Sequence, residues 1–119
     1  MLLVIADDSS VMRRIVSRTL RQVGLANLEI LEADNGAALV DLVLANQPDL
    51  VLSDWNMPTM TGLDALRAIR ANGSQVPFGF ITSEGSDVMR DLAKNAGASF
   101  LLVKPFTAET MQEALAAFV

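Results

Sequence analysis

The sequence predicts an α/β domain in which a doubly wound sheet of five parallel strands carries five helices, some on each face. Two observations predict this class. Short apolar runs, typical of strands covered on both faces, recur along the chain. Between them lie segments whose apolar residues repeat at helical spacing. No linker, repeat or low-complexity tract interrupts the pattern, so we expect residues 1–119 to form a single domain.

The first half of the chain supplies three strands and two helices. The run LLVIA (2–6) predicts the first strand, and a helix follows from Ser9 or Ser10 to about Val23, where Gly24 ends it. EILEA (29–33) predicts the second strand, and the dipeptide NG precedes a helix over about 37–46. DLVLS (49–53) predicts the third strand.

The second half repeats the alternation. A helix is expected over 62–72, closed by a glycine, and PFGFIT (77–82) predicts the fourth strand. A helix over 86–96 begins at a serine, a good N-cap, and ends at another glycine. SFLLV (99–103) predicts the fifth strand, and a helix over 107–118 completes the set.

Composition excludes several classes of protein. Half of the residues are hydrophobic, yet no apolar run approaches the ~20 residues that cross a bilayer. The first residues, MLLVIADD, lack the basic region of a secretory signal. The chain has no cysteine and no histidine, which excludes disulfides, thiolate or imidazole metal sites and a histidine base. A net charge of −5 argues against direct binding of nucleic acid. We expect a cytoplasmic protein without membrane insertion.

Polar residues stand where four of the five predicted strands end. They are Asp7 and Asp8 after the first strand, Asp54 after the third, Thr82 and Ser83 at the fourth, and Lys104 after the fifth. Ligands of open parallel sheets bind beyond the carboxyl ends of the strands, at the point where the strand order reverses. We therefore expect these side chains to meet in one crevice.

The residue types at these strand ends suit phosphoryl transfer. Three crowded carboxylates, Asp7, Asp8 and Asp54, fit a hard divalent cation with oxygen ligands, namely Mg²⁺. Lys104 adds a compact positive charge and Thr82 adds a hydroxyl donor. Phosphoryl transfer depends on positioning and charge neutralisation, and it can proceed through an aspartyl phosphate.

Four stretches together resemble the receiver domains of two-component response regulators, and within that family the single-domain chemotaxis regulators. The stretches are Asp7-Asp8, DWNMPTMTGLDALRAIR at 54–70, TSE at 82–84 and GASFLLVKPF at 97–106. The resemblance covers the chain from end to end. It implies a flavodoxin-like sheet with the strand order 2-1-3-4-5, and a signalling protein without enzymatic activity on an external substrate.

The resemblance also implies a phosphoacceptor and a metal site. Asp54 would accept a phosphoryl group from the phosphohistidine of a histidine kinase or phosphotransfer domain. Asp8, Asp54 and the backbone carbonyl of Asn56 would hold Mg²⁺, and Asp7 would act through water.

Further roles implied by the resemblance concern the switch. Lys104 would pair with Asp54 and then with a phosphoryl oxygen, and Thr82 would move to hydrogen-bond another. The Lys104–Pro105 peptide would be cis, which is uncommon for such bonds. Output to a downstream protein target would pass through the face formed by the fourth helix, fifth strand and fifth helix.

Four positions near the site modulate these expectations. Leu101 stands where the family usually has Tyr or Phe, and Phe100 cannot replace that ring because adjacent strand residues point to opposite faces. Ser83 stands where the family favours a smaller residue. Asn56 and Glu84 match the chemotaxis regulators at positions that tune loss of the phosphoryl group, so we expect quick self-dephosphorylation.

Alternatives remain open. A haloacid-dehalogenase-type phosphohydrolase would want an acid where Asn56 stands, and Asp7-Asp8 would repel the phosphate of a flavin. A receiver within a larger response regulator, or one that binds partners without phosphorylation, also fits. Arg14, Arg18 and Arg21 form a stripe on the first helix that is either a solvated face or a docking surface for kinase-side partners, which approach this side in such families.

Overall fold

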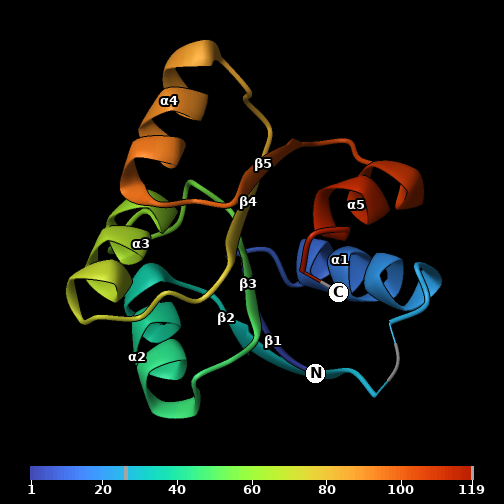
Figure 1. The fold of residues 1–119 in the computed structure, drawn as a ribbon, viewed down its shortest axis with the longest axis horizontal. Coiled ribbons are helices and arrows are strands. Elements are labelled where there is room, and N and C mark those ends of the chain that lie inside the picture. The colour runs from blue at the N-terminus through green and yellow to red at the C-terminus, as the bar shows by residue number, and fades with distance from the viewer. Residues whose placement is uncertain (26, 119) are drawn as a thin grey trace.

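Five parallel strands form the sheet at the centre of the computed structural model, which describes residues 1–25 and 27–118. They are β1 (Leu2–Ala6), β2 (Glu29–Ala33), β3 (Leu50–Ser53), β4 (Phe78–Thr82) and β5 (Phe100–Val103). Their order is β2-β1-β3-β4-β5, so the expected fold class and strand order are confirmed (Figure 1).

Five helices cover the two faces of the sheet. They are α1 (Ser10–Gln22), α2 (Gly36–Asn46), α3 (Gly62–Ala71), α4 (Asp87–Ala96) and α5 (Ala108–Leu115). Figure 1 shows α1 and α5 together on one face, and α2, α3 and α4 on the other. Each helix begins at a residue whose side chain accepts a hydrogen bond from the first turn, as good N-caps do. The caps are Ser9, Asn35, Thr61, Ser86 and Thr107.

The last helix is shorter than the sequence pattern predicts. It was expected over 107–118, but α5 ends at Leu115 and residues 116–118 form a turn. The N–H of Ala116 bonds to the carbonyl of Glu113, and that of Phe118 to the carbonyl of Leu115. These bonds span three residues and tighten the chain out of the α-helical pattern. The other boundaries lie within two residues of those expected.

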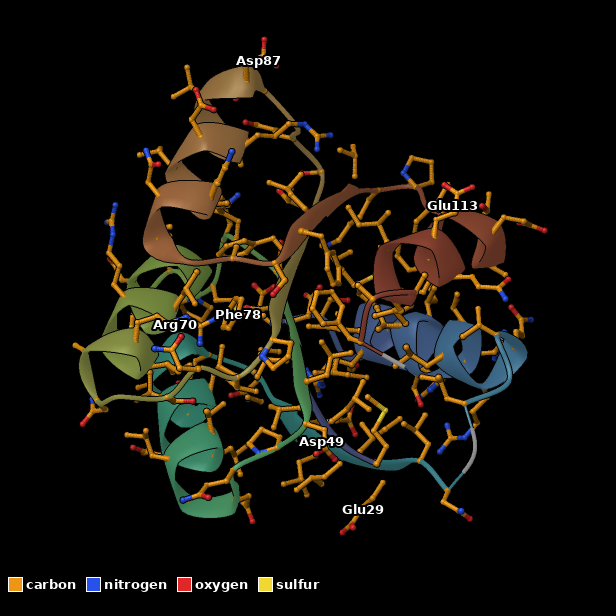
Figure 2. The ribbon with its side chains drawn as sticks, viewed as in Figure 1. Glu29, Asp49, Arg70, Phe78, Asp87 and Glu113 are labelled. Carbon is orange, nitrogen blue, oxygen red and sulfur yellow. The ribbon has the colours of Figure 1, made fainter. Side chains whose placement is uncertain are left out.

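The strands alternate their side chains between two apolar clusters, one on each face. The cluster beneath α2, α3 and α4 contains Val4, Val51, Phe78 and Phe80, all fully buried. The cluster beneath α1 and α5 contains Leu3, Ile5, Leu50 and Leu52. Figure 2 shows Phe78 in the interior, whereas Asp87 and Glu113 lie at the outer surface. Burial on both faces explains why these strands read as continuous apolar runs.

The strand register brings the carboxyl ends of the central strands level. Ala6, the last residue of β1, pairs with both Ala33 of β2 and Ser53 of β3. Polar residues that directly follow these strands therefore emerge at the same edge. Within the residues described, none of the helices has the length and apolar character needed to cross a membrane.

Candidate functional site

Three carboxylates gather at the carboxyl edge of the sheet, as the sequence predicts. Asp7 and Asp8 follow β1, and Asp54 follows β3, its direct neighbour. One carboxylate oxygen from each lies within 4.8 Å of the others. A set of hard oxygen donors at this spacing suits a hard divalent cation.

Asp7 is the most firmly held of the three. Its N–H donates to the carbonyl of Ala33 (3.0 Å), which extends the β1–β2 ladder by one residue. Its Oδ1 accepts from the N–H of Ser9 at 2.9 Å, and its Oδ2 accepts from Lys104 Nζ at 3.2 Å. The side chain is only 6% exposed, so these partners supply most of what water would otherwise provide.

Asp54 is held by the backbone on both sides of it. Its N–H donates to the carbonyl of Ala6 (2.8 Å), and its Oδ1 accepts from the N–H of Trp55 (2.8 Å). Ser53 Oγ donates to the Asp54 carbonyl at 2.8 Å. A Cβ at Gly62 would collide with that same carbonyl, so only glycine lets the start of α3 approach so closely. The carboxylate therefore sits on a rigid support.

The charges around Asp54 do not balance. Burial raises the pKa of Asp54 above its ordinary value of 3.8. The ammonium of Lys104 and the hydrogen bond from Trp55 oppose that rise, whereas the negative charges of Asp7 and Asp8 add to it. In the described part of the chain, Lys104 pairs with Asp7 and Asp54 but not with Asp8, so the three carboxylates carry more negative charge than this one amine neutralises.

Lys104 reaches this cluster from the end of β5. Its Nζ lies 3.2 Å from Asp7 Oδ2 and 3.7 Å from Asp54 Oδ2. The expected pairing with Asp54 is present, but Asp7 is the nearer partner. The Lys104–Pro105 peptide is cis, as the resemblance implied.

Thr82 ends β4 and is fully buried. Its hydroxyl accepts a hydrogen bond from the N–H of Glu84 at 3.3 Å. Ser83 and Glu84, which follow it, are exposed, and so is Asn56 in the loop between β3 and α3. The structure thus presents the three expected modulating positions to solvent.

Leu101 and Phe100 point to opposite faces of β5, as expected. Leu101 packs against the cluster beneath α2, α3 and α4, and Phe100 against the cluster beneath α1 and α5. Leu101 also lines a shallow groove of about 280 Å³ between α4 and β5, together with Arg90 and Lys94. The groove lies on the expected output face.

The arginine stripe of α1 borders a larger surface groove, of about 720 Å³. Arg14, Arg18 and Arg21 are exposed along it. Among the described residues, the ion pairs found use Arg13, Arg67 and Lys104 as cations. The stripe therefore keeps its charge available to a partner.

Two contacts of the site were not foreseen from the sequence. The first is the hydrogen bond from the N–H of Trp55 to Asp54, which is a backbone contact and cannot be predicted from a pattern of side chains. Arg13 donates from NH1 to the Asp7 carbonyl (2.8 Å) and pairs through Nε with Glu32 (2.9 Å). Two features of the sequence could have predicted these contacts of Arg13. Arg13 lies on the side of α1 that faces the sheet, and the second predicted strand contains an acidic residue that could pair with it.

The sequence matches a known protein family. The model of the response regulator receiver domain family matches residues 3–116. The chain belongs to that family.

The relatives found include chemotaxis proteins. The chain is 39% identical to the chemotaxis protein CheY of Pseudomonas aeruginosa over 115 residues, which cover 95% of this chain and 91% of that protein. It is 40% identical to CheY1 of Helicobacter pylori, covering 97% and 94% of the two chains. It is 41% identical to CheY-3 of Vibrio cholerae, covering 97% and 88%. The chain is thus a CheY-like receiver domain.

Solved structures show the same fold. CheY4 of Vibrio cholerae superposes with a TM-score of 0.87 at 32% identity, covering 99% of this chain and 98% of that one. The receiver domain of the putative response regulator NarL from Mycobacterium tuberculosis gives a TM-score of 0.87 at 29% identity, covering 98% and 93%.

Proposed function

We propose that this chain is a phosphorylation-switched signalling protein whose phosphoacceptor is Asp54. The observation that carries the proposal is the cluster of three carboxylates within 4.8 Å of one another, with Lys104 3.7 Å from Asp54. The phosphoryl donor is the phosphohistidine of a histidine kinase or phosphotransfer domain, and the receiver domain works in the cytoplasm.

The donor set fits Mg²⁺. Asp8, Asp54 and the backbone carbonyl of Asn56 are its ligands in this proposal, with Asp7 acting through water. Burial is the main reason that the pKa of Asp54 is raised, and the negative charges of Asp7 and Asp8 add to the rise, so a bound cation would stabilise the ionised carboxylate. When bound, Mg²⁺ supplies the charge neutralisation that an incoming phosphoryl group requires.

The residues of the chain position the reacting oxygen. Asp54 Oδ1 is engaged by the N–H of Trp55, which leaves Oδ2 on the side of Lys104. Transfer forms an O–P bond at Asp54 and breaks the P–N bond of the donor histidine, which leaves with the electron pair. Lys104 then pairs with one phosphoryl oxygen, and Thr82 turns its hydroxyl towards another.

The switch acts through the face formed by α4, β5 and α5, where a downstream protein binds. Thr82 couples the site to this face because β4 lies directly beside β5. The groove along Arg14, Arg18 and Arg21 provides the surface for the kinase-side partner. Asn56 and Glu84, exposed beside the site, give the phosphorylated form a short lifetime.

Trp55 provides the test. It is the only tryptophan and packs against Phe80, with ring centroids 4.8 Å apart. Addition of Mg²⁺ and then acetyl phosphate should change its fluorescence, and the intact mass should increase by one phosphoryl group. Asp54→Asn should keep its fold and lose the acetyl phosphate response and the mass gain. A wild-type protein that gains no mass would overturn the proposal and leave a binding module that works without phosphorylation.

A further inference from the structure

Arg13 links three parts of the molecule beside the acidic cluster. It projects from α1, donates from NH1 to the backbone carbonyl of Asp7 at 2.8 Å, and pairs through Nε with Glu32 of β2 at 2.9 Å. Its side chain is 18% exposed, whereas that of Glu32 is 54% exposed. A guanidinium can make both bonds at once because its donors form a rigid planar fork.

The carbonyl that Arg13 holds belongs to the peptide between Asp7 and Asp8. That peptide is planar, so fixing its carbonyl oxygen also fixes the N–H and Cα of Asp8. With the N–H and Cα of Asp8 in place, only rotation about its N–Cα bond and its side-chain torsions remain to set the direction of the carboxylate. Arg13 therefore acts on Asp8 through the backbone, without touching its carboxylate.

Asp8 depends on this restraint more than its neighbours do. Asp7 has hydrogen-bond partners on both carboxylate oxygens, and Asp54 has the N–H of Trp55 and the ammonium of Lys104. In the described part of the chain, the exposed Asp8 carboxylate has neither a hydrogen bond nor an ion pair. Its backbone is therefore the part of Asp8 through which neighbouring residues can restrain it.

We propose that Arg13 is a positioning residue that orients Asp8 for cation binding by holding the Asp7–Asp8 peptide, and that Glu32 keeps Arg13 in place. The inference rests on the proposed function, since Mg²⁺ is the ligand that Asp8 is positioned to bind. It adds a residue that contacts neither the cation nor the phosphoryl group.

Charge and positioning predict opposite effects when Arg13 is neutralised. A positive charge near an acidic site weakens the binding of a cation, so losing the charge alone would tighten Mg²⁺ binding. Losing the restraint on Asp8 would weaken Mg²⁺ binding, because residues that orient a metal ligand without touching the metal commonly affect metal affinity. Whether Mg²⁺ affinity rises or falls therefore distinguishes the charge effect of Arg13 from its positioning effect.

The experiment titrates Mg²⁺ against Trp55 fluorescence in five variants. Arg13→Gln should bind about tenfold more weakly than wild type. Arg13→Lys keeps the charge but not the fork, and should also bind more weakly. Arg14→Gln, the matched control, removes a neighbouring exposed charge and should bind at least as tightly as wild type. Glu32→Ala should weaken binding, whereas Glu32→Gln keeps an acceptor for Arg13 and should restore it.

A second readout does not depend on the cation. In chelator, hydrogen exchange at the amides of Asp8 and Ser9 should accelerate in Arg13→Gln and stay unchanged in Arg14→Gln. Unchanged exchange, or Mg²⁺ binding as tight as in wild type, would overturn the role of Arg13. A wild type that fails to bind Mg²⁺ would instead count against the proposed function, and the exchange result would still decide whether Arg13 holds the loop.

Discussion

Lys104 lies closer to Asp7 than to Asp54: its Nζ is 3.2 Å from Asp7 Oδ2 and 3.7 Å from Asp54 Oδ2. The amine is therefore shared, with its hydrogen bond directed to the more buried carboxylate. Asp54 keeps a raised pKa although a cation stands beside it, because burial and the charges of Asp7 and Asp8 together exceed the effect of Lys104. Asp54 is thus held next to its counter-ion without being fully neutralised by it.

Removal of the amine should destabilise the folded protein. Lys104→Met leaves three carboxylates close together with no cation among them, and we expect a loss of about 1–3 kcal/mol in the free energy of unfolding. Urea denaturation in chelator measures it, and added Mg²⁺ should recover part of the loss. Lys94→Met, on the exposed side of α4, serves as the control and should change stability by less than about 0.5 kcal/mol. Equal stability of the two variants would show that the shared pairing contributes nothing.

The raised pKa of Asp54 makes stability depend on pH. In the folded state Asp54 keeps its proton at pH values where the unfolded chain has released it, so the folded state binds more protons in that window. The free energy of unfolding therefore falls as pH rises from about 3.8 through the raised folded pKa of Asp54.

Asp54→Asn should remove this dependence. In chelator, the unfolding midpoint of the variant should rise relative to wild type across that window and stay higher at neutral pH. Thermal melts in a series of buffers measure the difference. A difference that does not vary with pH would mean that Asp54 titrates as an ordinary exposed aspartate, and that the cluster is less crowded than its geometry indicates.

Much of this molecule follows from patterns in the sequence. Continuous apolar runs predict the five strands because both faces of the sheet are covered, and the positions of Asp54 and Lys104 directly after such runs place them at one edge. The convergence of three carboxylates is a consequence of topology: β1 and β3 are neighbours, so Asp7, Asp8 and Asp54 have to meet. The strand order itself came from the family resemblance, since an apolar run does not reveal its neighbour.

The other features of the structure depend on tertiary contacts, which the spacing of apolar residues in the sequence does not predict. The last helix ends early at Leu115 because hydrogen bonds spanning three residues tighten its end. The preference of Lys104 for Asp7 depends on differences of half an ångström. The role of Arg13 needs the side chain to find a carbonyl and a carboxylate on two other elements. Sequence patterns identify which side chains come together, and tertiary packing determines which hydrogen bonds and ion pairs each of them makes.

Gly79 and Phe100 form a close pair across β4 and β5. They are register partners on β4 and β5, and a Cβ at Gly79 would collide with the ring of Phe100. The ring also approaches Phe118, with centroids 6.1 Å apart, so it bridges the sheet to the end of the chain beyond α5. Because Gly79 has no side chain, it leaves room in the middle of β4 for the ring of Phe100.

This pairing predicts a compensating exchange. Gly79→Val should destabilise the protein by about 1–3 kcal/mol through overpacking, and Phe100→Ala by about 2–4 kcal/mol through the cavity it leaves. In the double variant the valine occupies part of the space vacated by the ring, so the loss should be smaller than the sum of the two. Urea denaturation of the four proteins gives the interaction energy. Additive losses would show that the two positions do not share this space.

Leu101 allows a test of the switch itself. It lies half-buried in the groove between α4 and β5, where the family usually has an aromatic ring. A ligand or modification shifts a conformational equilibrium only through contacts that differ between the two states, and a leucine offers fewer such contacts than a ring that can move. Phosphorylation of wild type should therefore change the hydrogen exchange of α4 only slightly.

Leu101→Tyr should enlarge that change. The groove of about 280 Å³ gives the larger side chain a place outside the core, so the unmodified variant should unfold within about 1 kcal/mol of wild type. Exchange along α4 is compared with and without acetyl phosphate in wild type, in Leu101→Tyr and in Leu101→Tyr/Asp54→Asn, which lacks the proposed phosphoacceptor. If Leu101→Tyr responds no more than wild type, the aromatic ring is not what limits coupling, and Thr82 must act on α4 through the backbone of the segment that joins β4 to α4.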